Sequence, residues 1–191
     1  MDSIEAFINN VLPLSKKAND LFRSVMVEKT YNKGDEFVSL GEVPTKFYIL
    51  KEGIARAFIV DDKGKEHTRT LFVPITTTGS LTALVKNKPS EATYDCLTDC
   101  SVLEGDYYKF VELTKKHHEL SLFHSKVLEN VFLHVVKRIN ELTVLNATER
   151  YIKLNNEVPE INNLIQQYHI ASYLNITPVQ LSRIRKELYS K

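Results

Sequence analysis

The spacing of the hydrophobic positions changes twice along the chain. Residues 4–22 carry apolar side chains at helical intervals, beginning with Ile4, Phe7 and Ile8. After residue 24, short β-rich runs alternate with turn residues, and glycine stands at positions 34, 41, 53, 64, 79 and 105. Seven runs predict strands: 25–31, 36–40, 46–51, 54–60, 67–73, 92–96 and 101–105. Many short strands at near-regular spacing predict a β-barrel or jelly roll.

A heptad repeat follows the strand region. The spacing of its apolar members alternates between four and three residues: Leu128, Phe132, Val135, Ile139 and Leu142. We interpret this seam as a long helix that pairs with the same helix of a second subunit. The alternative is a helix that lies on its own barrel, and Phe123, Val127 and Val131 widen the apolar face enough for part of the helix to do both.

A joint between two domains is predicted at Asn146. The stretch Asn146–Glu149 has the form of a capping box, in which the Asn side chain accepts from an amide and Glu149 answers back. A new helix is therefore expected over about 147–155. The predicted organisation is an α+β chain with a barrel domain at 1–120, a dimerisation helix at 121–145 and a helical C-terminal domain at 146–191.

The last helical pair has the pattern of a helix-turn-helix. Asn175 stands at the turn, where a left-handed backbone is needed, and Ala171 is small where two helices must approach closely. Thr177 is a good N-cap, and Pro178 follows at the first helical position. The predicted inward-facing set is apolar: Ile170, Leu174, Ile176, Leu181 and Ile184.

The outer face of the last helix carries the candidate DNA contacts. Gln180 could read adenine, Arg183 guanine, and Val179 a thymine methyl group. Arg185 and Lys186 are better placed for phosphates. The full predicted set is Thr177, Pro178, Val179, Gln180, Ser182, Arg183, Arg185 and Lys186.

Charge and composition restrict the alternatives. The formal net charge is only +1, but residues 166–191 hold four cations and one anion, so any attraction for nucleic acid is local. No apolar run approaches a membrane span, so we expect a cytoplasmic protein without a membrane partner. Cys96 and Cys100 have an even spacing that predicts one face of one strand. Two buried thiols are the favoured interpretation and a redox pair is the alternative, while the histidines form no metal-site pattern.

The chain resembles the Crp/Fnr family of bacterial transcription regulators. The resemblance is carried by the glycine spacing of "NKGDEFVSLGEVPTKFYILKEG", by the long helix, by "NATERYIKL" and by "IASYLNITPVQLSRIRKEL", which is similar to short Crp-like regulators of Bacteroidetes. It implies a cyclic-nucleotide-binding-like barrel, a homodimer, double-stranded DNA as partner and RNA polymerase as a further candidate partner. Relatives usually add a hairpin wing after the last helix, and only residues 188–191 follow it here.

The candidate effector pocket departs from the family pattern. In cyclic-nucleotide-binding relatives a Gly-Glu pair is followed about ten residues later by Arg and then Ser or Thr. Here Ser80 follows Gly79, and Pro89 or Ser90 stands where the Arg is expected. A buried phosphate without a paired cation is strongly disfavoured, so we expect no ordinary cAMP binding. An unknown small-molecule effector, or none, is predicted for the segment that includes Gly79, Ser80, Leu81, Lys88, Pro89 and Ser90.

Three function classes are compatible with these observations to different degrees. The favoured hypothesis is a homodimeric, sequence-specific DNA-binding regulator. The alternative is a small-molecule-binding or protein-interaction module whose terminal helices contact protein. An enzyme is disfavoured, because the sequence offers no nucleophile with a base, no paired-carboxylate motif and no phosphate loop.

Overall fold

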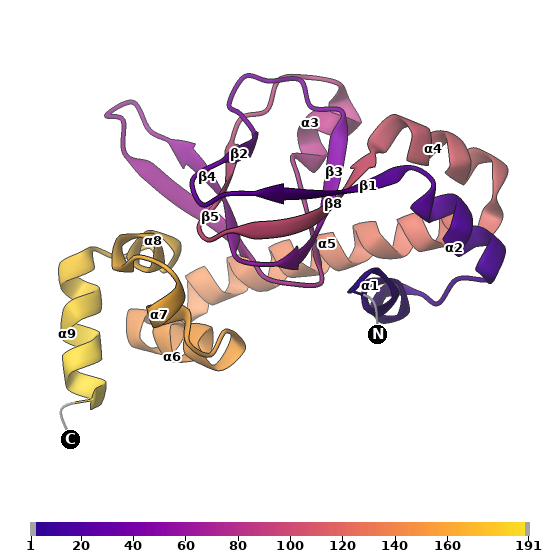
Figure 1. Ribbon diagram of the computed structural model, residues 1–191. Coiled ribbons are helices and arrows are strands. Elements are labelled where there is room, and N and C mark those ends of the chain that lie inside the picture. Colours follow the sequence, from indigo (N-terminus) through magenta and orange to yellow (C-terminus); the bar gives the residue numbers. More distant parts are fainter. Residues whose placement is uncertain (1–2, 190–191) are drawn as a thin grey trace.

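The computed structural model describes residues 3–189 (Figure 1). Two four-stranded antiparallel sheets form a jelly roll, a long helix runs beneath it, and helical units lie at its two ends. The predicted α+β class with an N-terminal jelly roll is confirmed. In the described part of the chain, no helix is both long enough and apolar enough to cross a bilayer.

The eight strands divide between two sheets in the order β1-β8-β3-β6 and β2-β7-β4-β5. All seven predicted strand runs are present, with ends shifted by a few residues at most, and β6 was not predicted. Three threonines without an apolar alternation form β6, so the period-two signal is absent there. The strands are β1 Met26–Tyr31, β2 Glu36–Val38, β3 Lys46–Glu52, β4 Ala55–Val60, β5 Glu66–Phe72, β6 Thr76–Thr78, β7 Thr93–Cys96 and β8 Cys100–Asp106.

Aromatic side chains fill the interior of the jelly roll. The Phe37 and Tyr48 rings lie 4.8 Å apart in an edge-to-face arrangement, and Tyr31 and Tyr94 pack around them. The buried Tyr48 hydroxyl donates to the Phe37 carbonyl at 2.9 Å, so its polar atom is satisfied inside the core. Burial raises the pKa of Tyr31 to about 12 and also raises the pKa of Tyr48, so both phenols stay neutral.

The N-terminal helical segment is broken rather than continuous. Helix α1 spans Ser3–Val11 and α2 spans Lys16–Arg23, with Pro13 between them. Proline has no backbone N–H to donate and disfavours helix at the preceding residue. The Ser15 side chain accepts from Ala18 N–H (3.3 Å) and starts the second helix. Both helices share a core with α4 (Tyr107–Lys116) and the start of α5, built on Phe7, Phe22, Phe110 and Phe123.

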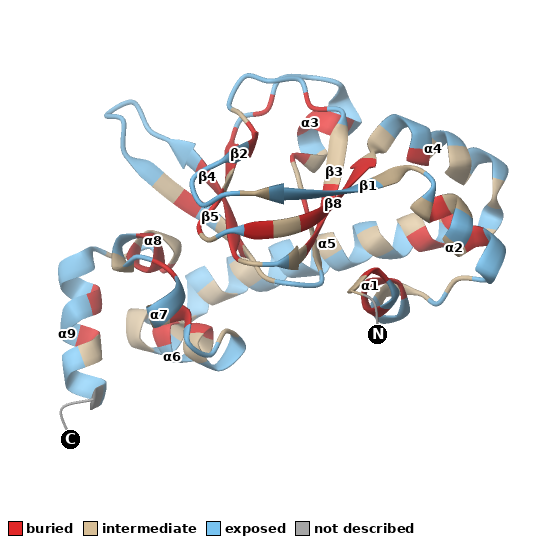
Figure 2. Cartoon of the chain, in the orientation of Figure 1, coloured by how far each residue is buried: buried red, intermediate tan, exposed pale blue. Residues whose placement is uncertain are grey.

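The long helix α5 (His118–Val144) has two different halves. Its first turns are buried against its own subunit, because Leu120 and Phe123 have no exposed surface. Its second half is exposed, and Figure 2 shows it in pale blue and tan beneath the barrel. All five seam residues are exposed in the single chain, and Phe132 retains 65% of its surface. The seam thus lacks a partner within the described chain, while the first turns use the alternative packing.

The prediction that the two cysteines lie on one strand is wrong. Cys96 ends β7 and Cys100 begins β8, so a turn and a change of sheet separate them. Both are buried and free. Contact between the two thiols raises the pKa of Cys96 and lowers that of Cys100.

Four helices complete the chain: α6 Ala147–Glu157, α7 Ile161–Leu164, α8 Gln167–Tyr173 and α9 Pro178–Tyr189. The capping box at Asn146 is present, with Glu149 N–H donating to Asn146 Oδ1 (3.0 Å) and Asn146 N–H donating to Glu149 Oε2 (2.8 Å). These helices share one core with the barrel residues Ile54, Leu71 and Leu97. The C-terminal unit is therefore packed directly on the barrel.

Candidate nucleic-acid interface

The turn between α8 and α9 has the backbone that the sequence predicts. Asn175 adopts the left-handed conformation (φ 54°), and Ile176 N–H donates to the Ala171 carbonyl at 3.0 Å. Thr177 Oγ1 then accepts from Gln180 N–H (3.2 Å), which makes Thr177 the N-cap of α9. Two helices joined by such a short turn form the predicted helix-turn-helix.

The apolar side of the unit is sealed. One buried cluster joins the two helices of the motif. Its members are Ile170 and Ala171 of α8, Leu174 directly after α8, and Leu181 and Ile184 of α9. Ile176 is partly buried against the same core. The inward-facing set is confirmed, so α9 is held rigidly with its opposite side free.

The outer side of α9 faces solvent. Figure 2 shows this helix at the end of the molecule, pale blue on its outer side. Val179 retains 62% of its surface, and Arg185 is half-buried. The other predicted contact residues are exposed: Thr177, Pro178, Gln180, Ser182, Arg183 and Lys186. No charged partner of Arg183 or Lys186 is found among residues 3–189, so both cations are available to a ligand.

Gln180 has a structural use that the sequence interpretation did not include. Its Oε1 accepts from Thr177 N–H (2.9 Å) and lies 3.1 Å from Thr177 Oγ1, which completes a capping box. Bidentate reading of adenine needs both the oxygen and the nitrogen of the amide. Gln180 must therefore break its capping bonds before it can read a base in that way.

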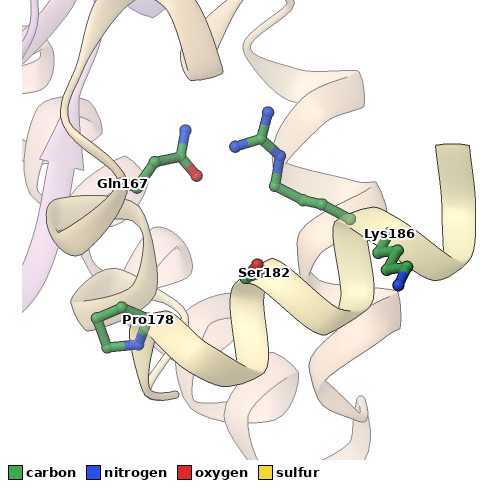
Figure 3. A pocket seen from close by; sticks show the side chains of 5 residues that line it. Gln167, Pro178, Ser182 and Lys186 are labelled. Atoms are coloured by element: carbon green, nitrogen blue, oxygen red, sulfur yellow. The ribbon is translucent and has the colours of Figure 1, made fainter.

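A hollow of about 370 Å³ lies between the two helices of the motif. It is lined by Gln167 of α8 and by Pro178, Ser182, Arg185 and Lys186 of α9. Figure 3 shows the Gln167 amide and the Ser182 hydroxyl pointing toward this space from opposite sides. Figure 3 also shows the Lys186 amino group turned away from this space, so Arg185 is the cation that, with the two polar groups, suits a phosphate oxygen. The sequence interpretation missed Gln167, because its contribution depends on how α8 packs against α9.

Two arginines fix the C-terminal end of α8. The Arg138 guanidinium stacks on the Tyr173 ring at 3.9 Å and donates to the Tyr173 carbonyl. Arg150 donates to the Leu174 carbonyl (3.1 Å) and to the Leu145 carbonyl. In the sequence Arg138 appeared only as a charge beside the seam. Both side chains bind carbonyl groups that the helix itself leaves unpaired, so α8 is tied to α5 and α6.

The candidate effector segment forms a small closed structure. Gly79 has φ 128°, which favours glycine, and α3 (Leu81–Lys86) follows Ser80. Ser80 and Ser90 are both buried. The Ser90 hydroxyl donates to the Ala92 carbonyl (2.7 Å), and its oxygen lies 2.9 Å from Ser80 Oγ. The two serines are thus within hydrogen-bond distance of each other, at or next to the positions where the family pattern has Glu and Arg.

Three other residues of the candidate pocket set are not buried. Lys88 and Pro89 are exposed and Leu81 is half-buried. The described residues therefore provide no buried cation beside Ser80 and Ser90. In the described part of the chain, no group of three or more His, Cys, Asp or Glu side chains is arranged to hold a metal ion.

We predict that cAMP does not bind at micromolar concentration, because the barrel interior is filled and an anionic phosphate would lie beside two hydroxyl groups without a cation. Isothermal titration calorimetry checks this, with the Lys88→Ala variant as a matched control. A micromolar dissociation constant at one nucleotide per chain would show that the prediction is wrong. Loss of that binding in the variant would identify Lys88 as the cation that pairs with the phosphate.

His169 on α8 introduces a pH dependence. Burial, with the nearby positive charge of Arg56, lowers its pKa from 6.5 to about 4, although Asp95 and Glu66 act in the opposite direction and Lys33 adds to the lowering. The folded chain therefore takes up this proton at lower pH than the unfolded chain. Stability contributed by neutral His169 is complete above pH 6.5 and is lost as the pH falls toward 4.

We expect unfolding free energy to fall by on the order of 1–2 kcal/mol between pH 7 and pH 5 through this residue alone. Denaturant titrations at both pH values measure the effect. His124 also has a lowered pKa through burial, so the comparison that isolates His169 is wild type against His169→Gln. Equal pH slopes for the two proteins would contradict the assignment.

Comparison with known proteins identifies the fold. Residues 28–117 match the family described as cyclic nucleotide-binding domain. No curated protein matches the chain in sequence. The chain is similar to the structure of FixK2 from Bradyrhizobium japonicum, with 16% identity and a TM-score of 0.74, over 87% of this chain and 85% of that one.

Two further structures have the same architecture. One is the c-di-GMP responsive global regulator CLP from Xanthomonas campestris, with 14% identity and a TM-score of 0.70 over 92% of both chains. The other, from Eubacterium rectale, is described as a Crp/Fnr-family transcriptional regulator, with 17% identity and a TM-score of 0.70 over 93% of this chain and 87% of that one. Residues 28–117 therefore resemble the cyclic nucleotide-binding domain family, and the chain as a whole has the fold of these solved regulators.

Proposed function

We propose that the protein is a homodimeric transcription regulator that binds specific sites in double-stranded DNA through α9. The observation that carries the proposal is the division of α9 into a sealed apolar side and an exposed polar side with unpaired cations. A helix of this kind fits the major groove, where base edges differ from pair to pair. The similarity to regulators of known fold supports the same role.

The exposed seam of α5 supports the homodimer. Leu128, Phe132, Val135, Ile139 and Leu142 form an apolar stripe with coiled-coil spacing on a helix that is solvent-exposed in one chain. Pairing of two such stripes about a two-fold axis presents two α9 helices to one face of DNA. Half-sites about one helical turn apart then match the pair.

The proposal divides the chain into a barrel domain at 1–120, a dimerisation helix at 121–145 and a DNA-binding domain at 146–191. In this scheme the barrel supports the dimer. An effector other than cAMP shifts the equilibrium between arrangements of the DNA-binding domains only if it binds one arrangement more tightly. RNA polymerase is a further partner that such a regulator would contact.

A gel-shift experiment with genomic fragments at two salt concentrations tests the proposal. We expect a few fragments to be retained in preference to the bulk, with affinity that falls steeply as salt rises, because phosphate contacts release counterions. The double variant Arg183→Ala, Arg185→Ala should abolish retention at the higher salt. Retention of no fragment at the lower salt would refute the proposal and favour the protein-interaction alternative.

A further inference from the structure

Helix α8 is bound to an edge strand of its own barrel. Strand β5 lies at the end of the sheet order β2-β7-β4-β5, so one side of its backbone has no neighbouring strand. Thr68 N–H on that strand donates to Ser172 Oγ at 2.9 Å, and the Ser172 hydroxyl lies 3.3 Å from the Glu66 carbonyl. One serine therefore satisfies a donor and an acceptor of the strand edge.

Apolar side chains close the space beside these hydrogen bonds. Ile54 and Leu71 of the barrel belong to the same buried cluster as Ile170 and Leu174 of the helix-turn-helix. Ala171 is fully buried there and lets the helix approach the strand closely. The contact is therefore a continuous core rather than a hydrated surface contact, and Figure 1 shows α8 lying next to β5.

A buried charged group stiffens the barrel side of the contact. Arg56 is 4% exposed and is held by two hydrogen bonds to Asp95 (2.9 and 3.0 Å) and by an ion pair with Glu66 (2.7 Å). The Glu66 carboxylate thus binds Arg56 while its carbonyl faces Ser172. The segment of β5 that meets α8 is consequently tied to the neighbouring strands β4 and β7.

The same C-terminal end of α8 is also fixed by Arg138 and Arg150, which bind the Tyr173 and Leu174 carbonyls directly after Ser172. Contacts with both the barrel and α5 leave α8 little freedom to rotate. They leave the outer side of α9 exposed, with Val179 at 62%. The docking of α8 therefore sets the direction of α9 without covering it.

We propose that Ser172 is a positioning residue, which, through the α8–β5 contact, sets the spacing between the two α9 helices of the dimer. The inference rests on the proposed DNA-binding function. Each α9 is rigidly attached to α8, each α8 to its barrel, and each barrel to the seam helix. A change at Ser172 should therefore alter which half-site separation the dimer accepts, without altering which bases α9 reads.

The test compares wild type with Ser172→Ala on symmetric DNA sites whose half-sites are moved apart or together by single base pairs. We expect Ser172→Ala to lose about 3–10-fold in affinity at the preferred spacing, as the loss of a hydrogen-bonded anchor predicts. The affinity that Ser172→Ala loses at the neighbouring spacings should be smaller, so its affinity depends less on half-site spacing than that of wild type. Affinity for DNA without a site should stay unchanged, and Ser172→Thr, which keeps the hydroxyl, should restore the wild-type profile.

Hydrogen exchange provides a second measurement that does not depend on DNA. The Thr68 amide should exchange faster in Ser172→Ala than in wild type, while the control Thr82→Ala, which removes an exposed hydroxyl from α3, leaves it unchanged. If the wild-type protein binds no DNA sequence specifically, the proposed function and the positioning role of Ser172 are both refuted. A wild type that binds specifically and a Ser172→Ala variant with the same affinity and spacing profile would overturn the positioning role alone.

Discussion

Phe132→Glu should convert the protein to a monomer and lower its affinity for a symmetric DNA site by at least about 100-fold. Phe132 is the most exposed of the five seam residues and retains 65% of its surface in the single chain. In the paired seam the substitution removes two aromatic side chains and brings two carboxylates close together in an apolar environment. Because the side chain is exposed in one chain, the fold of the monomer should survive.

Sedimentation equilibrium and fluorescence anisotropy measure the two effects. The matched control is Asn130→Glu, which adds the same charge at an exposed position of α5 outside the seam. We expect the control to remain dimeric with wild-type affinity. A Phe132→Glu protein that is dimeric and binds as tightly as wild type would show that the seam is not the subunit interface.

Arg183→Ala should cost about 1–3 kcal/mol at each half-site, twice that for the dimer, and should relax specificity at one base position. The exposed guanidinium lies on the outer side of α9, and a bidentate contact to guanine is the pairing that its fork favours. Arg185→Ala should instead weaken all sequences alike and reduce the salt slope, because Arg185 lines the hollow with Gln167 and Ser182.

Affinities for a site library at two salt concentrations separate the two roles. The informative comparison is the pattern across bases, since each variant removes one positive charge from the same helix. If Arg183→Ala reduced binding to every sequence by the same factor, the base-reading assignment would be wrong and Arg183 would be a phosphate contact.

Local signals in the sequence were sufficient for most of the fold. Alternating runs between glycines predicted seven of the eight strands, and the Asn146 capping box and the Thr177-Pro178 start of α9 were predicted from single residues. Helix α4, with ten residues, was not predicted as a separate element. The other missed segments are short: β6 has three residues, α7 has four and α3 has six. Elements of that length show no periodicity of their own, so only packing stabilises them.

The parts of the site that depend on long-range contacts were not predictable. Arg138 appeared to be a seam flank, yet it binds the end of α8 across 35 residues of sequence. Gln167 lines the hollow beside α9 because the turn places the two helices next to each other. Ser172 binds a strand more than a hundred residues away in the sequence. The outer face of α9, by contrast, was identified correctly as what remains once its apolar positions are buried, which is a local property.

Directed cleavage of DNA from α9 tests whether this helix inserts into the major groove. Val179→Cys introduces an exposed thiol on the outer side of α9, whereas Cys96 and Cys100 are buried, so an iron chelate can be attached at position 179 alone. We expect two clusters of cuts in the bound fragment, about one helical turn apart and related by two-fold symmetry. The same chelate on Lys88→Cys, far from α9 on the barrel, should give none. Uniform cutting from position 179, or no cutting of a fragment that the protein retains, would contradict the insertion of α9 into the groove.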